Sequence, residues 1–447
     1  MLERLFHLRE KGSTPGREVA AGCTTFAAMA YILVVNPAIL ADAGMPREAL
    51  VTATALGAAI ATLLMAFMAN LPLAMAPGMG INAFFAYAVC IGMGVPWQSA
   101  LALVFVNGVI FLALSLGGIR EKIVRSIPPF LKAAICAGVG LFIAFVGLKN
   151  GGLVVAHPAT FVAFGDLTRG PVALFAVGIL LTCVLVARGT PAAILISIGI
   201  LSLAGLFIPD AKGAMLTSLP KNPVSLPASI EPLFLKLDFG FLLREPFKAL
   251  PVILTLLLVD LFDNLGTLIG VTKRAGLMDE KGHLPGIARA LTADSLAAII
   301  SSLLGTSTVV SYIESSTGVQ AGGRTGLTAV TVAILFLLAL FLTPLLLAIP
   351  AVAVAPALVV VGITMFSSVA EIDLHRFEIA APAVLTILGM PLAFSISSGM
   401  GLGIIAAVAI ALFSGKGREN LTPFTWGLGA IFLLHFAEPL IFRWLGM

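Results

Sequence analysis

Four acidic residues lie within or beside long apolar stretches of the chain: Asp260, Asp263, Asp294 and Glu314. A carboxylate near the middle of a bilayer costs roughly 2.5–3.5 kcal/mol on insertion scales, so such residues are retained for function or pairing. Three of them stand among glycine, hydroxyl and amide side chains, in LTLLLVDLFDNLGTLIG (254–270) and GTSTVVSYIESSTGVQAGGRTG (305–326). This mixture favours a polar cavity that binds a polar solute and protons over a helix that faces lipid.

Asp260 and Asp263 are three residues apart, which places them on one face of a helix about one turn from each other. Asn264 and Thr267 extend that polar face. Two carboxylates on one turn in a low-dielectric setting repel each other, so they do not both ionise freely. We therefore expect one of the two to contact the solute and the other to handle the proton; Asp260 is the preferred contact and Asp263 the preferred proton carrier, and the exchanged assignment stays open. The alternative is a structural pair hydrogen-bonded to neighbouring helix ends.

Glu314 follows a hydroxyl-rich run and is predicted to begin a short helix. The run contains Thr306, Ser307, Thr308 and Ser311. Backbone amides at the start of a half-helix stabilise anions and polar ligand atoms in the membrane. A carboxylate at this place can accept two N–H bonds from a planar heterocycle and can also carry a proton. Ser307 and Thr308 are candidate contacts beside it.

The remaining candidate residues have simpler explanations beside the functional one. Asn82 follows APGMG at the start of a short helix, where its amide fits the mixed donor and acceptor edge of a nucleobase. Asn is also a favoured helix N-cap. Phe26 could stack on a base with Thr25 beside it, although ordinary packing explains an aromatic residue there. Asp294 either lines the proton route or makes a structural polar contact within the helix bundle.

Composition places the chain in the class of polytopic membrane proteins. Of its 447 residues 59% are hydrophobic and 11% are charged, whereas soluble domains carry about 25% charged residues. The basic residues are scattered over short loops, which excludes nucleic-acid binding. No Ser/His/Asp set and no phosphate-loop lysine occur, so an enzyme is not expected. The four cysteines are far apart without a Cys-x-x-Cys spacing, which argues against a zinc site or a disulfide framework. No cofactor is expected.

Apolar segments of membrane-spanning character recur along the whole chain. Fourteen helices are predicted near 19–40, 48–69, 82–93, 98–116, 130–148, 170–187, 191–208, 249–271, 287–304, 311–320, 326–348, 351–368, 379–396 and 400–414. Two of them, 82–93 and 311–320, are too short to span alone and follow irregular stretches, of which GTSTVV (305–310) could run extended. Backbone of that kind survives at membrane depth only where protein or a water-filled cavity surrounds it.

The loop charges predict that both termini are cytoplasmic. Lys and Arg are enriched in the segments that this orientation puts inside, as the positive-inside rule requires. The start of the chain is charged and has no apolar core followed by a cleavage site, so no signal peptide is expected. The tail 421–447 is predicted to lie at the interface or the periphery, with a fifteenth span as the alternative.

An internal repeat determines the expected architecture. VTATALGAAIATLL (51–64) aligns without gaps with LTADSLAAIISSLL (291–304), with seven identities in fourteen positions. Each copy follows one long helix and precedes one broken segment. Two halves of seven spans must insert with opposite orientation, and inverted repeats with broken helices place the binding site at the midplane. We expect an all-α protein with a first repeat over 1–208, an external loop over 209–247 and a second repeat over 248–447.

These motifs resemble the AzgA-like purine permeases of the nucleobase/ascorbate transporter superfamily. The resemblance is carried by TTFAAMAYILVVNP (24–37), APGMGINAFFAY (76–87), VDLFDNLGTLIG (259–270) and GTSTVVSYIESSTGVQAGGRTGLTAV (305–330). It implies a core domain of helices 1–4 and 8–11 and a gate domain of helices 5–7 and 12–14. It also implies proton-coupled uptake of hypoxanthine, guanine or adenine, with substrate contacts from Asn82, Asp260 or Asp263, and Glu314.

The resemblance further implies a multi-pass protein of the cytoplasmic (inner) membrane, in contact with lipid and with a homodimer through the gate domain as a further expectation. Relatives that carry uracil or xanthine have Glu where this chain has Asp263, one methylene shorter. The shorter side chain either leaves room for a larger purine or shifts the contact to Asp260. Two alternatives stay open. One is a uracil or xanthine permease, and the other is a sulfate- or bicarbonate-type anion carrier of the same fold, which the midplane carboxylates disfavour.

Overall fold

The computed structural model describes residues 2–117, 126–210, 213–278, 284 and 286–444, and most of them are helical. In the first half the elements are α1 Leu2–Phe6, α2 Pro15–Met29, α3 Ile32–Asp42, α4 Arg47–Leu64, β1 Met75–Pro77, α5 Met79–Ala83, α6 Trp97–Leu116, α8 Pro129–Asn150, β2 Val154–His157, β3 Phe161–Phe164, α9 Gly170–Ala187 and α10 Ala193–Ala204. In the second half they are α11 Gly240–Arg244, α12 Pro246–Arg274, α13 Ile287–Leu304, β4 Val309–Ser311, α14 Ser315–Gln320, α15 Gly326–Ala339, α16 Thr343–Ala348, α17 Ala351–Phe366, α18 Phe377–Leu392, α19 Ile396–Ser414 and α20 Pro423–Trp444.

The helices begin and end close to the predicted positions. The predicted segments 170–187 and 287–304 coincide with α9 and α13. The prediction was wrong for 311–314, because the extended stretch runs on through β4 and α14 begins at Ser315. The prediction also missed the hairpin of β2 and β3 and the break between α2 and α3, where Tyr31 lies in a turn.

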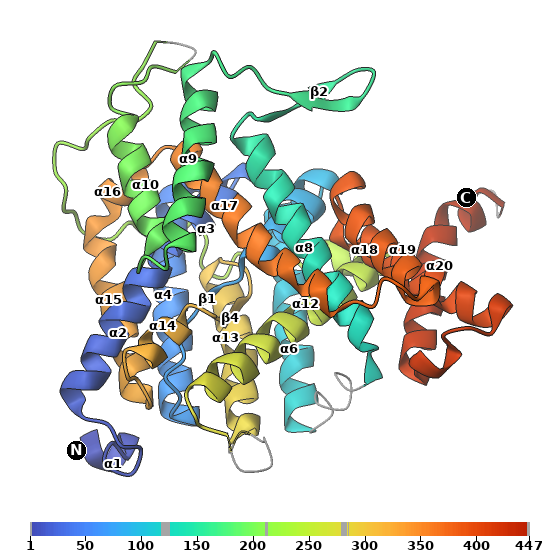
Figure 1. Cartoon of the computed structure of the whole chain (residues 1–447), viewed down its shortest axis with the longest axis horizontal. Helices are drawn as coiled ribbons and strands as arrows, with labels where there is room; N and C mark the ends of the chain where they lie inside the picture. The colour runs from blue at the N-terminus through green and yellow to red at the C-terminus, as the bar shows by residue number, and fades with distance from the viewer. Residues whose placement is uncertain (1, 118–125, 211–212, 279–283, 285, 445–447) are drawn as a thin grey trace.

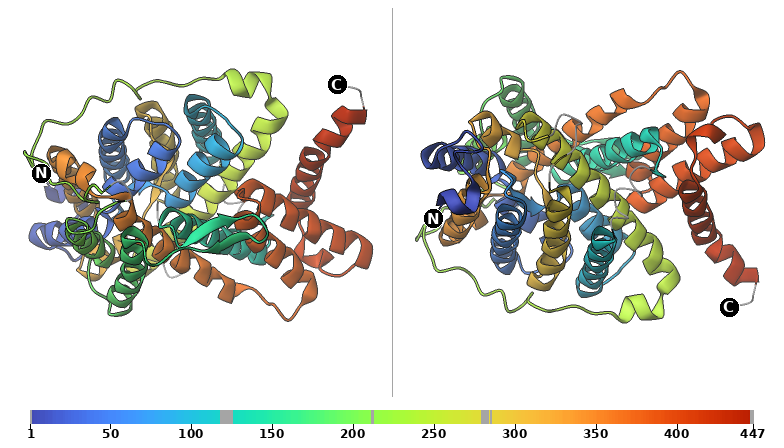
Figure 2. Two further views of the ribbon diagram at one scale, coloured as in Figure 1. Left: turned by 90° about the horizontal axis from the view of Figure 1, so that it is seen from above. Right: turned by 90° about the horizontal axis from the view of Figure 1, so that it is seen from below.

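Among the described residues nine helical segments are long and apolar enough to cross a membrane. The stretches Met79–Gly92, Ala193–Ala204, Phe377–Leu392 and Pro423–Ala437 are apolar but shorter. The chain is therefore a multi-pass membrane protein, and the count of fourteen spans stays a prediction. Helix α20 packs on α19 and α12 and projects from the body toward the C-terminus (Figure 2). Helix α20 is not among the nine candidate spans. An interfacial or peripheral helix and a fifteenth span both stay predictions for the tail.

The two halves of the chain repeat each other in their packing. Helices α4 and α13 each have 18 residues, and their bounds differ by 240 positions, the offset of the sequence repeat. Helix α4 packs against α15 of the other half, and the corresponding helix α13 packs against α6. In the same way α9 packs on α17 and α10, while α18 packs on α8 and α19. These matching contacts have the pattern that two related halves produce.

Two very short strands meet in the interior, one from each half. Strand β1 pairs antiparallel with β4, with Met75 opposite Ser311 and Pro77 opposite Val309. The pairing continues beyond the strands, since the Gly78 N–H donates to the Thr308 carbonyl (3.0 Å) and the Tyr312 N–H to the Ala74 carbonyl (3.0 Å). Buried backbone groups must find partners inside the protein. The strand pair supplies them where the chain is not helical, and it joins the segments that lead into α5 and α14. Figure 1 shows β1 and β4 in the middle of the molecule.

The connection between the halves includes a strap, residues 213–247, that bonds to three helices, α4, α6 and α13. The Ala228 carbonyl of the strap accepts a hydrogen bond from Thr52 Oγ1 on α4 (2.9 Å). Backbone N–H groups of the strap donate to the carbonyls of Leu303 at the end of α13 and Gln98 on α6. Asp238 in this strap accepts from Ser99 Oγ (2.7 Å) and from the Gly240 N–H, and these bonds lower the pKa of its carboxyl.

Candidate functional site

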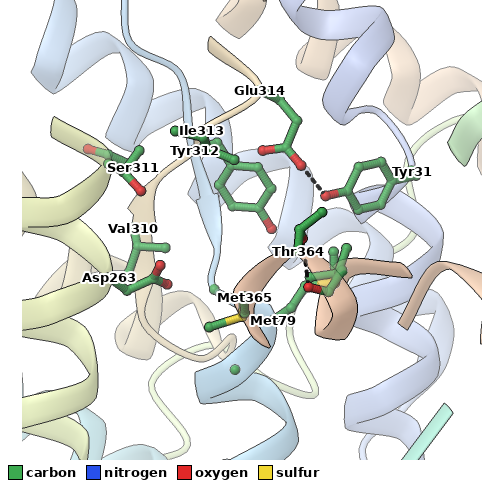
Figure 3. A pocket seen from close by; sticks show the side chains of 14 residues that line it. Tyr31, Met79, Asp263, Val310, Ser311, Tyr312, Ile313, Glu314, Thr364 and Met365 are labelled. Carbon is green, nitrogen blue, oxygen red and sulfur yellow. Dashed lines mark hydrogen bonds between the residues drawn. The ribbon is translucent and has the colours of Figure 1, made fainter. Parts of the chain in front are cut away.

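A cavity of about 100 Å³ lies beside the paired strands (Figure 3). The first half of the chain contributes Tyr31, Gly78, Met79 and Gly80 to its lining. The second half contributes Asp263, Thr267, Val310, Ser311, Tyr312, Ile313 and Glu314, together with Val361, Thr364 and Met365 of α17. Two predicted site residues, Asp263 and Glu314, therefore face one cavity from different elements. This is the midplane arrangement that broken helices of two repeats are expected to form.

Glu314 is held in place by Tyr31. The Tyr31 hydroxyl donates to Glu314 Oε1 at 2.5 Å, and the Tyr31 side chain is buried (Figure 3). Glu314 occupies the N-cap position of α14, as the sequence predicts for the start of a short helix. A hydrogen bond to a charged acceptor is short and strong. One carboxylate oxygen is thus fixed by the protein, and the other is left to accept from a ligand in the cavity.

The two acidic residues of α12 face different surroundings. Asp263 lines the cavity beside Thr267. Asp260 is buried and does not line it; its Oδ2 accepts from Asn107 Nδ2 on α6 at 3.3 Å. Three residues correspond to about 300° around a helix, so the two side chains point about 60° apart. That difference is enough to direct one carboxylate to the cavity and the other to a neighbouring helix.

Asn82, Ser307 and Thr308 lie close to the cavity but outside its lining. Asn82 is within α5, whose N-cap is Gly78, so the N-cap alternative for Asn82 is wrong. Its side-chain oxygen accepts a hydrogen bond from the Ser307 hydroxyl, which joins the two broken segments. The Asn82 amide nitrogen and the Thr308 hydroxyl are buried without a hydrogen-bond partner among the described residues.

Thr25, Phe26 and Asp294 are placed in the helix packing around the site. Phe26 meets Phe336 edge to face, with ring centroids 5.2 Å apart. Thr25 is buried against α14, where a Cβ on Gly318 would come within 2.1 Å of its hydroxyl. Asp294 Oδ1 accepts from Asn264 Nδ2, and Asn264 Oδ1 accepts from the Ser311 N–H (3.1 Å). Asp294 is thus connected through one amide to a strand that lines the cavity.

The sequence interpretation missed three residues that lie at the cavity. Tyr31 and Tyr312 carry hydroxyls there, and Tyr312 Oη donates to the Pro77 carbonyl (2.6 Å). A signal for both existed, because the chain has only three tyrosines and all lie in the motifs of the resemblance. Thr364 of α17 and Ile313 are the exposed residues of the cavity lining, so they mark its open side. Nothing in the apolar pattern of α17 singles out that position.

Solved structures of membrane transporters share this fold. The transmembrane domain of the cyanobacterial bicarbonate transporter BicA superposes with a TM-score of 0.61 at 16% identity, over 85% of this chain and 96% of that chain. The structure of SLC26A9 gives a TM-score of 0.61 at 12% identity, over 89% of this chain and 65% of that chain. Identities this low show the fold alone. They confirm the predicted fold class of a helical transporter domain.

The family follows from the sequence itself. The Permease family matches residues 16–402, and the chain belongs to that family. The adenine permease AdeP of Escherichia coli (strain K12) is 42% identical over 97% of this chain and 95% of its own length. The guanine/hypoxanthine permease PbuG of Bacillus subtilis (strain 168) is 42% identical over 97% of this chain and 99% of its own length. The resemblance to purine permeases is confirmed, and the protein is a transporter and not an enzyme.

Proposed function

We propose that the protein carries purine nucleobases across the cytoplasmic membrane together with protons. The observation that supports this most directly is the pair of carboxylates, Glu314 and Asp263, facing one cavity from two elements. A purine presents ring N–H donors at its planar edge, and ionised carboxylates are acceptors only. The named relatives carry adenine, guanine or hypoxanthine. Relatives and cavity chemistry therefore agree on the substrate class.

Within this proposal Glu314 and Asp263 both contact the purine, because both line the cavity. The proposal thus assigns the contact to Asp263 and not to Asp260, the residue preferred from the sequence. Asp260 does not line the cavity and accepts a hydrogen bond from Asn107. In this proposal it adjusts the proton affinity of Asp263, its neighbour on α12. Asp294 belongs to the same proton-handling group through Asn264. Two carboxylates around one small cavity repel each other, so binding of a neutral base is favoured when one of them is protonated.

We further propose an elevator-like cycle in which the core domain moves against the gate domain. Residues 228–238 of the strap bond to helices assigned to the core, which would keep that body intact as it moves. The gate domain contributes Val361, Thr364 and Met365 to the cavity. A cavity lined from both bodies changes its exposure when one body slides past the other. Cytoplasmic termini and a homodimer through the gate domain belong to the same proposal.

The test is uptake into proteoliposomes that contain only the purified protein. Labelled hypoxanthine, adenine and guanine should accumulate when the outside is acidic, and the three should compete with one another. Excess sulfate or bicarbonate should not compete, which separates this proposal from an anion carrier. Competition by uracil or xanthine alone would move the assignment to that branch of the superfamily. Accumulation of none of the purines under any imposed gradient would refute the proposal.

A further inference from the structure

A chain of hydrogen bonds joins three helices at one surface of the protein: α3, α8 and the helical stretch Phe84–Gly92, which continues α5. The Tyr87 hydroxyl donates to Asp42 Oδ2 (2.7 Å) and accepts from Asn150 Nδ2 (2.7 Å). Asp42 and Asn150 are the last residues of α3 and α8. Tyr87 is 2% exposed, whereas Asp42 and Asn150 are exposed at the surface above it. The tyrosine therefore bridges two helix ends from beneath.

Aromatic packing supports the same junction. Phe394, in the turn between α18 and α19, meets the Tyr87 ring edge to face with centroids 6.1 Å apart. Phe394 also packs edge to face on Phe142 of α8 at 5.3 Å, and the Lys149 ammonium lies 4.8 Å from its centroid. Phe394 has a positive φ of 50°, which is uncommon for a bulky residue. Such a conformation persists only where the surrounding contacts hold it.

The junction and the open side of the cavity lie apart along the fold. The helix that carries Tyr87 begins at Met79 in the cavity lining and continues as a π-helical stretch, Phe84–Gly92. Tyr87 is therefore beyond the cavity along this helix, while the open side is formed by Ile313 and Thr364. Near the cavity the same helix is pressed against α8, because a Cβ on Gly80 would come within 2.8 Å of Val139 Cγ1. The helix is therefore held against α8 at two places, at Gly80 beside the cavity and at Tyr87 through Asn150.

We propose that Asp42, Tyr87 and Asn150 form a latch that closes the cavity on this face and breaks when the cavity opens there. The inference rests on the proposed movement of core against gate, since α3 and the Tyr87 helix belong to the first body and α8 and Phe394 to the second. Both outer partners of Tyr87 are exposed, so water replaces them readily when the bodies part. The buried aromatic contacts align the tyrosine again when the bodies return.

The latch predicts a pattern that depends on the direction of each bond. Tyr87→Phe keeps the ring but removes both bonds. Asn150→Asp places two carboxylates around one hydroxyl, which can donate to only one of them. Asp42→Asn alone keeps an acceptor and should change little. The double variant Asp42→Asn with Asn150→Asp exchanges donor and acceptor across Tyr87, and it should restore the chain of bonds.

The measurement is the distance between spin labels at Glu48→Cys on α4 and Ala156→Cys on the β2–β3 hairpin, in protein whose native cysteines are replaced. Both positions are exposed and outside the latch. Tyr87→Phe and Asn150→Asp should raise the ratio of long to short distances about 2- to 150-fold, the range expected for losing one or two net hydrogen bonds. Asp42→Asn and the exchanged double variant should match the parent.

An unchanged distance distribution in Tyr87→Phe would overturn the latch, as would an exchanged double variant that stays open. If Tyr87→Phe or Asn150→Asp does not fold, the double variant Asp42→Asn with Asn150→Asp still tests the latch, because it keeps the chain of bonds. The distances are recorded without substrate, so their outcome is independent of purine uptake. Loss of the proposed function would appear as absent uptake by the wild-type protein, whatever the labels report.

Discussion

Replacing Glu314 by Gln should weaken purine binding about 10- to 150-fold, and the reason lies in the contact with Tyr31. The Tyr31 hydroxyl donates to Glu314 Oε1 at 2.5 Å. In the Gln variant only the side-chain oxygen can accept, so Tyr31 holds that oxygen and turns the NH2 group toward the cavity. A ligand N–H then meets a second donor. Loss of a hydrogen bond to a charged group costs about 1.5–3 kcal/mol, and about 1.4 kcal/mol corresponds to a tenfold change in affinity.

The assay is equilibrium binding of labelled adenine or hypoxanthine to the purified, detergent-solubilised protein. Adding Tyr31→Phe to Glu314→Gln frees the amide to turn its oxygen to the ligand, so the double variant should recover part of the lost affinity. The two changes are then non-additive, as expected for residues in contact. Glu48→Gln, the same chemical change at an exposed position, is the matched control. Wild-type binding by Glu314→Gln, or no effect of Tyr31→Phe on that variant, would refute this reasoning.

Four further outcomes are expected. Asp263→Asn should impair purine binding, whereas Asp260→Asn should leave binding intact and abolish accumulation; binding and uptake measured separately decide this, and normal values for both variants would make the pair structural. A protonophore should collapse uptake and removal of sodium should not, so uptake that survives the protonophore but requires sodium contradicts proton coupling. Gly80→Ala should slow transport because its Cβ would lie 2.8 Å from Val139 Cγ1, and Val139→Ala in the same chain should restore the rate; equal rates in wild type and Gly80→Ala would show that this contact is not tight. Glu18→Ala should lower the free energy of unfolding by about 3 kcal/mol, because the buried carboxylate accepts from two backbone N–H groups and one hydroxyl. An unchanged melting temperature in detergent would contradict this expectation.

The sequence predicts the helical framework well because bilayer length and apolar composition dominate it. The bounds of α9 and α13 follow from apolar runs alone. The sites of broken backbone are also predictable, since glycine, hydroxyl and acidic residues inside apolar segments have no other stable place. The resemblance to purine permeases added the substrate class that these patterns do not contain.

The details of the cavity depend on contacts that the sequence pattern does not encode. Tyr31 meets Glu314 across 283 residues of chain, and neither residue predicts the other. Asp260 and Asp263 share a face of α12, yet the direction of each carboxylate depends on the position of α6. Phe26 is a candidate for stacking on a base, and the sequence does not reveal that its ring also packs edge to face on Phe336. Spacing identifies which residues are unusual, and only the packed helices show what each one touches.

The central claim is that a purine occupies the cavity between Glu314 and Asp263, and its most direct test is protection of one cysteine. Thr364→Cys at the exposed side of the cavity, in a chain without its four native cysteines, is labelled with a maleimide at increasing purine concentration. Adenine, guanine or hypoxanthine should slow the labelling with the same half-maximal concentration as equilibrium binding, and sulfate should not. Purine that binds with full affinity while the labelling rate stays unchanged would place the substrate elsewhere and contradict the account.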